Sequence, residues 1–367
     1  MNPYQPQSLP LKNLDKSSLL TAVGEANAAL ARYDGLLMGM VNPEIMLSPL
    51  TNQEAVLSSK IEGTQATIEE VLEHEAGQDH DETKKQDIGE ILNYRKALML
   101  GKESITQRPI KLGLVRELHR ILMDSVRGKN KEPGYFRKDQ NWIGPTGCTI
   151  EQATFVPPSP IVLNDYLQLW EEYLDIDDID PIVQTAIVHA QFELLHPFKD
   201  GNGRIGRLLI PLFLYSKERL SSPMFYLSDY LESNRDEYYA RLRDISENKD
   251  WTGWCAFFLR AVIAQAKQNG RTLREINDLY ESTKTQIRDI THSPHSLQLI
   301  DALFDRPIFT AADIAIRADV PKPTVHKFIK NLLDEGVLET VRKAAGRRPA
   351  ILAFAELLNT LERRQLV

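Results

Sequence analysis

The sequence predicts a mainly α-helical protein with one short β-hairpin in its middle and a distinct module at its C-terminal end. Several segments keep apolar residues at helical spacing, as in SLLTAVGEANAALARYDGLL and LREINDLYESTKTQIRDI. Residues 133–160 are instead rich in glycine, proline and β-forming residues, which predicts a short hairpin. From about Leu297 the pattern changes to short helices followed by a second hairpin.

Length and composition indicate an ordinary globular protein. The chain has 367 residues, 42% hydrophobic and 26% charged, which is enough for two or three domains. Its formal net charge of −7 argues against a protein that coats nucleic acid with its whole surface, so any DNA contact must be local. Cys148 and Cys255 stand far apart, no secretory pattern opens the chain, and no apolar run spans a membrane. We therefore expect a cytoplasmic protein without a membrane partner.

The N-terminal region is expected to be helical after a proline-rich arm at residues 1–14. The segment PLTNQEAVLSSKIEG predicts a helix that Gly63 ends. Glu62 then lies at the negative end of the helix dipole, which costs about 0.3–1 kcal/mol. We therefore expect Glu62 to have a cationic partner. The simplest alternatives are an ion pair with nearby Lys60 or a carboxylate exposed to solvent.

The stretch HPFKDGNGRIGR, residues 196–207, contains the glycine spacing of a dinucleotide-binding turn. That turn requires a buried β-strand before its first glycine. The preceding segment PIVQTAIVHAQFELLHPF is of helical type, so the sequence argues against a dinucleotide-binding fold.

The same stretch predicts an anion site at a helix start. Gly201 and Gly203 permit backbone conformations that other residues avoid, and the apolar run that follows predicts a helix beginning at Asn202 or Gly203. Exposed N–H groups at a helix start bind anions. Arg204 and Arg207 are three residues apart, so we expect both on one face, within reach of a polyphosphate.

Two further side chains complete the predicted chemistry. Asp200 offers a hard oxygen ligand next to the anion, which is how Mg²⁺ is commonly held, by one carboxylate and phosphate oxygens. His196 can accept a proton from an attacking hydroxyl at neutral pH.

With these residues in view, HPFKDGNGRIGR resembles the signature of Fic-domain proteins, H-[PF]-F-x-[DE]-G-N-G-R-x-x-R, at every defined position. The resemblance implies transfer of AMP from ATP to a Ser, Thr or Tyr hydroxyl of a target protein, or of the enzyme itself. It implies His196 as the base and Asp200 as the Mg²⁺ ligand. The nucleotide-binding residues that it implies are Gly201, Asn202, Gly203, Arg204, Ile205, Gly206, Arg207 and Asn234.

A second motif lies upstream, where Ser58-x-x-x-Glu62-Gly63 resembles the Fic inhibitory motif [ST]-x-x-x-E-[GN] in its class II position. The resemblance implies that Glu62 pairs with Arg207 in the place of the γ-phosphate, so that the enzyme inhibits itself. The same glutamate could orient a water that removes AMP.

The region around the signature also resembles other parts of a Fic protein. QNWIGPTGCTIEQATFVPPSP resembles the β-hairpin flap, with Thr154 and Phe155 as flap residues that hold the target chain extended. Tyr238 and Tyr239 could pack against a purine, although core packing is an equally ordinary role for them. His189 and His119 are expected to be core or supporting residues, since no metal-ligand spacing surrounds them.

The tail from residue 297 resembles a winged helix-turn-helix. Residues 296–367 hold 11 Lys and Arg against 9 Asp and Glu, a modest positive surplus that leaves DNA binding and protein docking both open. The candidate recognition helix and wing offer Thr324, His326, Lys327, Lys330, Arg342, Lys343, Arg347 and Arg348.

We therefore expect a four-part division. Its parts are a regulatory helical region (1–105), a Fic core (106–270), a linking helix (271–295) and the winged helix (296–367). A homodimer is the family expectation. The alternatives are Fic-type transfer of UMP, phosphate or phosphocholine, and a DNA-binding regulator whose Fic core senses nucleotide.

Overall fold

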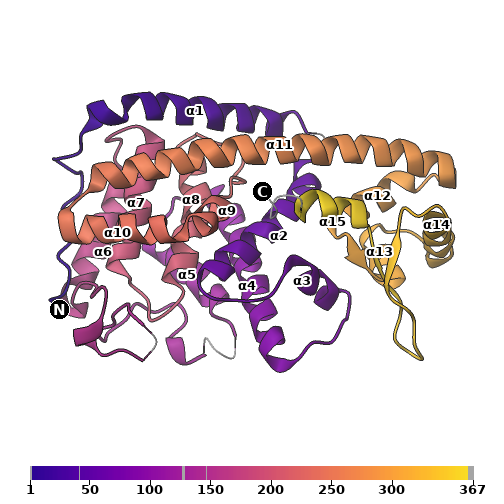
Figure 1. Cartoon of the computed structure of the whole chain (residues 1–367), viewed down its shortest axis with the longest axis horizontal. Helices are drawn as coiled ribbons and strands as arrows, with labels where there is room; N and C mark the ends of the chain where they lie inside the picture. The colour runs from indigo at the N-terminus through magenta and orange to yellow at the C-terminus, as the bar shows by residue number, and fades with distance from the viewer. Residues whose placement is uncertain (1, 41, 126–128, 146, 363–367) are drawn as a thin grey trace. The chain divides into compact units, whose positions relative to one another are not determined.

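The computed structural model describes residues 2–40, 42–125, 129–145 and 147–362, and the chain is mainly helical (Figure 1). This confirms the predicted fold class. The chain divides into two compact units that interleave along the sequence. The first unit comprises Met1–Asp34, Leu57–Thr64 and Gly89–Lys267, and the second comprises Gly35–Val56, Gln65–Ile88 and Gln268–Val367. Four helices contribute residues to both units: α1 (Lys16–Met38), α2 (Pro43–Ile61), α4 (Glu82–Ile105) and α11 (Trp251–Thr291).

The first unit is built around α7, which packs against α6, α8 and α10. Asp180 caps the start of α7 through a hydrogen bond to the Ile182 N–H, and Pro181 occupies its first turn, where no N–H is needed. Every residue of α7 except Pro181 and Glu193 is buried. The helices of this unit, besides the four named above, are α5 (Leu112–Leu122), α6 (Pro160–Leu174), α7 (Pro181–Leu195), α8 (Asn202–Ser216), α9 (Ser228–Ser233) and α10 (Arg235–Asn248).

The predicted flap is a loop that is pinned at one point. Ile143 and Phe155 form an isolated antiparallel bridge, with the Ile143 N–H donating to the Phe155 carbonyl at 2.8 Å. The short 3-10 helices η1 (Lys129–Lys131) and η2 (Ile150–Gln152) flank and interrupt this region. Residue 146 of the flap lies outside the described residues.

The second unit contains a three-stranded antiparallel sheet in the order β1-β3-β2. Ile308 pairs with Ala353, and Thr340 pairs with Leu352. The capping box of Thr67 and Glu70 starts α3, which packs against β1. The elements are α3 (Ile68–Glu75), α12 (Ser296–Asp305), β1 (Ile308–Phe309), α13 (Ala311–Arg317), α14 (Lys322–Asp334), β2 (Glu339–Arg342), β3 (Ile351–Ala353) and α15 (Ala355–Glu362). The order of helices and hairpin follows the prediction for the tail, with β1 and the terminal helix α15 added.

The linking helix expected at residues 271–295 is not a separate element, because it is part of one helix of 41 residues, α11. Gly270 lies inside it, and a Cβ there would come within 3.4 Å of the Leu36 side chain. A helix-interior glycine costs about 1 kcal/mol relative to alanine, and packing along the rest of α11 outweighs that cost. The sequence pattern alone did not predict this continuity.

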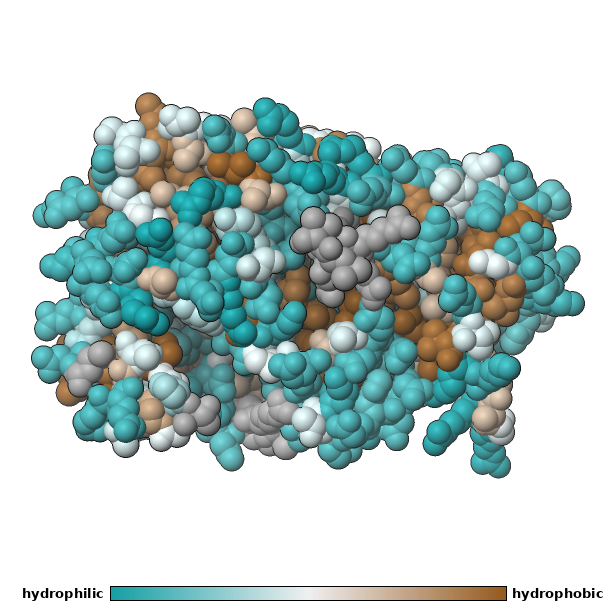
Figure 2. All heavy atoms as spheres, viewed as in Figure 1, coloured by the Kyte–Doolittle hydropathy of each residue, from teal (hydrophilic) through white to brown (hydrophobic). Residues whose placement is uncertain are grey.

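The face in Figure 2 is mostly hydrophilic, with apolar side chains in small groups. In the part of the chain that the structure describes, no helix has the length and apolar character needed to cross a membrane.

Candidate active site

The segment between α7 and α8 carries most of the predicted site residues. His196 follows the last residue of α7 in the left-handed region (φ 46°, ψ 60°), and its N–H donates to the Phe192 carbonyl at 3.0 Å. Gly201 is also left-handed (φ 76°) and precedes α8, which begins at Asn202, one of the two predicted starts. Side-chain-bearing residues rarely adopt this conformation, so neighbouring contacts must hold His196 in place.

Asn202 shapes this loop with its side chain. Its Oδ1 accepts the Phe198 N–H at 2.8 Å and its Nδ2 donates to the Phe198 carbonyl at 2.9 Å. The amide group is therefore engaged with the chain itself. What α8 offers to an anion is its first-turn N–H groups, which have no intrahelical partner.

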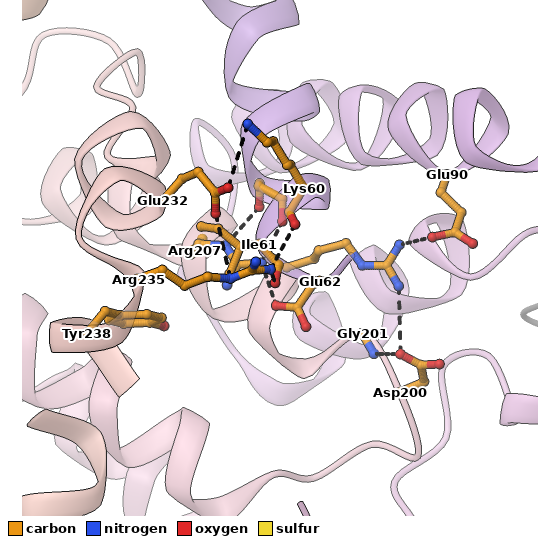
Figure 3. Close-up of polar contacts among 12 residues, drawn as sticks. Lys60, Ile61, Glu62, Glu90, Asp200, Gly201, Arg207, Glu232, Arg235 and Tyr238 are labelled. Carbon is orange, nitrogen blue, oxygen red and sulfur yellow. Dashed lines mark hydrogen bonds and ion pairs between the residues drawn. The ribbon is translucent and has the colours of Figure 1, made fainter. Parts of the chain in front are cut away.

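Arg207 lies buried beneath this helix start and contacts the end of α2. Its Nε donates to the Ser58 hydroxyl at 2.9 Å, and a terminal nitrogen donates to the Ser58 carbonyl at 2.8 Å. The same nitrogen lies 2.7 Å from Oε1 of Glu62 (Figure 3). Gly203 makes this approach sterically allowed, because a Cβ there would meet the Glu62 Oε1 at 2.2 Å.

Glu62 is ionised in this position. Burial opposes its charge, but the Arg207 guanidinium outweighs burial and lowers the pKa of Glu62. Lys60, the simpler partner, instead lies 3.7 Å from Glu232.

Arg235 holds the end of α2 from the other side. Its guanidinium donates to the carbonyls of Lys60 and Ile61, and it lies 3.7 Å from Glu232 (Figure 3). These carbonyls belong to the last turn of α2, which lacks intrahelical donors. Arg235 thereby fixes the segment that carries Glu62.

Arg204 does not share the partners of Arg207. One terminal nitrogen of its guanidinium lies 2.9 Å from Oε2 of Glu90, and the other lies 3.7 Å from Asp200. The two arginines were predicted to face one anion together. In the described structure Arg204 is paired with Glu90, and Arg207 with Glu62.

Asp200 borders a cavity of about 350 Å³ at the start of α8, within the range of small-ligand pockets. Its Oδ1 accepts the Gly201 N–H at 2.6 Å, and Oδ2 lies 3.7 Å from Lys131. The side chain of Asp200 is 46% exposed, so the carboxylate can take a further ligand. The cavity is lined by Glu62, Gly63, Thr64, Glu90, Leu122, Met123, Ser125, Lys131, Asp200 and Arg204.

His196 is neutral at physiological pH. Burial lowers the pKa of His196 to about 4, while the charges of Glu62 and Asp200 oppose the shift. A neutral imidazole is the form that can accept a proton. A bound polyanion would add negative charge and raise this pKa towards neutrality.

Asn234, Tyr238 and Tyr239 do not form a shared pocket in the described contacts. The Asn234 amide donates to the Tyr230 carbonyl at 2.9 Å, between α9 and α10. Tyr238 is 1% exposed, and its hydroxyl lies 3.0 Å from Nε2 of His189. Core packing therefore accounts for Tyr238 and His189, and the purine contact of Asn234 stays a prediction.

Thr154 and Phe155 lie at the pinned point of the flap. The Thr154 hydroxyl donates to the Ile143 carbonyl at 2.9 Å, and the Phe155 ring lies 5.7 Å from the ring of Tyr4. Their contact with a target chain stays a prediction.

Glu193 was missed by sequence reasoning. Burial raises the pKa of Glu193 to about 8, with a further rise from Glu62 and an opposing effect of Arg207. Its Oε1 is buried and has no hydrogen-bond partner among the residues that the structure describes, and a Cβ on Gly206 would meet it at 2.2 Å. The available signal was the single carboxylate of a largely apolar helix, three positions before His196.

His119 was expected to be a supporting residue and links two segments of the site. Its Nδ1 accepts the Gly134 N–H at 2.9 Å, and Nε2 lies 3.0 Å from the Asp200 carbonyl. The accepted bond makes Nδ1 the unprotonated nitrogen, so Nε2–H donates to Asp200. Burial lowers the pKa of His119 to about 4, and its ring stacks on Phe198 at 3.7 Å.

A left-handed histidine, an accessible carboxylate and a helix start beside a paired arginine are the kinds of groups found where proteins bind phosphate at a helix N-terminus. Comparison with known families agrees with this kind of site. The model of the Fic/DOC family N-terminal region matches residues 20–103, and the Fic/DOC family model matches residues 109–214. Together these matches cover more than half of the chain, and the chain belongs to the Fic/DOC family.

Individual relatives are distant. The chain is 28% identical over 216 residues to a protein of Aquifex aeolicus named probable protein adenylyltransferase, covering 56% of this chain and 58% of that one. It is 30% identical over 213 residues to protein adenylyltransferase Fic of Drosophila erecta, covering 56% of this chain and 38% of the relative. The matched region thus spans less than two thirds of either relative.

Among solved structures, a Fic family protein from Desulfovibrio desulfuricans superimposes with a TM-score of 0.55 at 19% identity. The superposition covers 96% of this chain and 98% of that one. At this identity the likeness concerns the fold.

Proposed function

We propose that this protein transfers AMP from ATP to a Ser, Thr or Tyr hydroxyl of a target protein, itself included, and that Glu62 restrains the reaction. The observation that carries the proposal is the start of α8, where Glu62 and Asp200 line one cavity, Glu62 is paired with Arg207, and the charges of both carboxylates act on His196. The names of the relatives from Aquifex and Drosophila support the same chemistry.

The reaction is an in-line displacement at the α-phosphorus. The target oxygen forms the new P–O bond, the bond between the α-phosphorus and the bridging oxygen to the β-phosphorus breaks, and pyrophosphate leaves. His196 takes the hydroxyl proton, and the α8 N–H groups stabilise charge on the phosphate oxygens. The proposed contacts to the target chain are Thr154 and Phe155 on the flap. The proposed contact to adenine is Asn234.

The residues present fit Mg²⁺ brought with the nucleotide. The described part of the chain contains no group of three His, Cys, Asp or Glu side chains that could hold a metal alone. Asp200 offers one partly exposed carboxylate, and phosphate oxygens would supply further ligands, as is usual for this ion. The ion would neutralise phosphate charge.

Glu62 restrains the reaction by occupying Arg207. A γ-phosphate needs a cationic partner, and Arg207 is already paired with a carboxylate and bonded to Ser58. Productive ATP binding must therefore displace Glu62, which costs the enzyme a charged, partly buried hydrogen bond.

The test compares wild type, Glu62→Gly and Glu62→Gly/His196→Ala incubated with Mg-ATP and read by intact mass. We expect an AMP adduct that appears fastest on Glu62→Gly and disappears with His196→Ala. Absence of an adduct on every form, and on added lysate proteins, would refute AMP transfer. Equal rates for Glu62→Gly and wild type would refute inhibition while leaving the transfer intact.

Transfer of another group is distinguished by the label. ATP labelled at the α-phosphorus should mark the product, and ATP labelled at the γ-phosphorus should not, since a kinase gives the reverse. UTP and CDP-choline serve as competing donors for UMP and phosphocholine transfer.

The ionised Glu62 also supports AMP removal as a second activity. A carboxylate at the edge of the cavity can accept a proton from water that attacks the phosphorus. Purified AMP-modified protein should then lose its label faster with wild type than with Glu62→Gly.

DNA binding by the C-terminal module is a second candidate function, favoured by one cationic helix face. The exposed side chains of α14 include Lys322, His326, Lys327 and Lys330, and in the described region none of the three lysines is ion-paired. Lys343, Arg347 and Arg348 are exposed at the predicted wing, and Thr324 is half-buried on α14. Arg342 is less suited, because it donates to Gln78 at 2.6 Å.

Fluorescence anisotropy with duplex DNA tests this function. The double variant Lys327→Glu/Lys330→Glu should weaken binding and reduce the slope of log affinity against log salt by about two phosphate contacts. Lys267→Glu, outside the module, is the control. If the wild-type protein bound no DNA at low salt, the DNA-binding function would be refuted. A DNA-binding regulator that only senses nucleotide would bind DNA and show no AMP adduct.

A further inference from the structure

We propose that Arg137 is a positioning residue that fixes the backbone of His196 and joins it to both ends of the flap. The proposal rests on the proposed role of His196 as the base. Arg137 itself lies within the sequence PGYFRKDQ, for which no role was predicted.

The guanidinium of Arg137 bonds to three separate pieces of chain. Nε donates to the His196 carbonyl at 2.9 Å, and one terminal nitrogen donates to the Leu195 carbonyl at 3.4 Å and to the Pro158 carbonyl at 2.6 Å. The other terminal nitrogen donates to the Asp139 carbonyl at 3.3 Å. Its main-chain N–H donates to the Pro197 carbonyl at 2.8 Å.

Arg137 is 3% exposed, and its side-chain hydrogen bonds within the described residues all end on backbone carbonyls. A buried charge normally requires a charged partner. Here the carbonyls of Leu195 and His196 belong to the C-terminal end of α7, where the helix dipole is negative and favours a cation. Burial still lowers the pKa of Arg137 to about 10, which leaves it charged at neutral pH.

These bonds explain how His196 keeps its left-handed backbone. A non-glycine residue persists in that region when several contacts determine its geometry. Arg137 sets the orientation of two successive peptide groups, those whose carbonyls belong to His196 and Pro197. The planar fork of arginine can hold the His196 carbonyl and the flap together, whereas a lysine ammonium cannot reproduce its geometry; the bond to the Pro197 carbonyl comes from the main-chain N–H of residue 137.

The same fork links the base to the target-binding segment. Asp139 and Pro158 are the residues where the flap segment leaves and rejoins the core, and both carbonyls accept from Arg137. One side chain therefore fixes the position of the imidazole that takes the proton relative to the loop that presents the hydroxyl. A displacement of about 1 Å in such a pair can cost about 100-fold in rate.

The test uses the full chain in the Glu62→Gly background, with Arg137→Lys, Arg137→Ala and the exposed control Arg243→Ala. We expect kcat for AMP transfer to fall by about 100-fold in Arg137→Ala and by a smaller factor in Arg137→Lys, with the Kd for Mg-ATP nearly unchanged. Guanidinium chloride, added below unfolding concentrations, should partly restore kcat in Arg137→Ala and should not affect the control. Unchanged kcat in a folded Arg137→Ala would overturn the proposal, as would a loss seen only in Kd.

Hydrogen exchange supplies a readout that does not depend on activity. The amides of His196 and of residues 198–201 should exchange faster in Arg137→Lys than in its parent, while amides of α6 and α10 stay unchanged. If exchange rises locally but the parent transfers no AMP, the proposed reaction is wrong and the positioning role stands. Equal exchange in parent and Arg137→Lys, or a uniform rise throughout the chain, would overturn the positioning role.

Discussion

Glu62 and Arg207 are 145 residues apart in the chain, and their side chains meet at 2.7 Å. The pair satisfies an arginine that is 1% exposed, while the glutamate side chain stays 34% exposed on the cavity side. Because the guanidinium lowers the pKa of Glu62, the carboxylate remains charged at neutral pH. Any ligand that needs Arg207 must therefore compete with an ion pair that already exists.

Arg235→Gln is expected to weaken this inhibition without touching the pair itself. Loss of the donors to the Lys60 and Ile61 carbonyls frees the end of α2. One such hydrogen bond contributes about 1 kcal/mol, which corresponds to about a fivefold change in a population. Basal AMP transfer should thus rise by about fivefold, to a rate below that of Glu62→Gly. Arg243→Gln is the matched control. If Arg235→Gln transferred AMP at the wild-type rate, Arg235 would not be holding Glu62 in its inhibitory position.

Asp200→Asn is expected to impair Mg²⁺ use while leaving the loop intact. Asparagine keeps an Oδ1 that can accept the Gly201 N–H, so the turn before α8 should survive. It loses the charge that a hard cation prefers. AMP transfer should fall by about 100-fold, and half-maximal activity should require more Mg²⁺. Asp177→Asn, on an exposed ion pair, is the control. An unchanged Mg²⁺ titration would remove Asp200 from the metal site.

Three histidines should make the protein acid-sensitive, of which His119 and His189 are buried and His196 is half-buried. Burial lowers the pKa of His119 and of His196 to about 4, and that of His189 to about 3, from 6.5. Each depressed pKa means that the unfolded chain binds more protons than the folded one between the two values. The free energy of unfolding should therefore fall as the pH drops below about 6.5. Urea titrations from pH 7 to 4 measure this decline.

Nuclear magnetic resonance separates the three contributions. The Cε1–H signals of His119, His189 and His196 should keep their neutral positions at pH 5.5, each assigned by its Gln variant. A His196 signal that titrates near 6.5 would show that burial does not control the base.

Local features of the site could be predicted from the sequence. The start of α8 followed from two glycines and an apolar run, and the pairing of Glu62 with Arg207 followed from the resemblance of two motifs to those of Fic proteins. The helix start depends on short-range backbone rules, and the ion pair is a single long-range contact that two motifs identify. The mainly helical class followed from apolar periodicity, for the same local reason.

Partners set by packing could not be predicted. Arg204 and Arg207 lie on successive turns, yet Arg204 forms an ion pair with Glu90 on α4 and Arg207 forms one with Glu62. The position of α4 depends on the whole core, which spacing within residues 196–207 does not encode. Arg137 was missed for a similar reason, because backbone carbonyls are its partners and no sequence pattern records them.

Glu193 is expected to contribute less to stability as the pH rises from about 4.5 to about 8. Its folded pKa of about 8 lies above the ordinary value of 4.5, so between these values the folded protein holds a proton that the unfolded chain has lost. The contribution of Glu193 to the free energy of unfolding should therefore decline as the pH rises across this window and level off above it, and it opposes the contribution of the three histidines at the acid end of the window. Glu193→Gln is neutral at every pH and lacks this decline.

The Tm difference between Glu193→Gln and wild type should accordingly grow from pH 5 to pH 8.5 in favour of the variant. Glu62 contributes to the raised pKa of Glu193, so in a Glu62→Gly background the decline should end at a lower pH and be smaller. Glu247→Gln, at an exposed site, should show a constant difference from wild type. A constant difference for Glu193→Gln as well would mean that Glu193 is ionised in the folded protein, with Arg207 rather than burial in control of its charge.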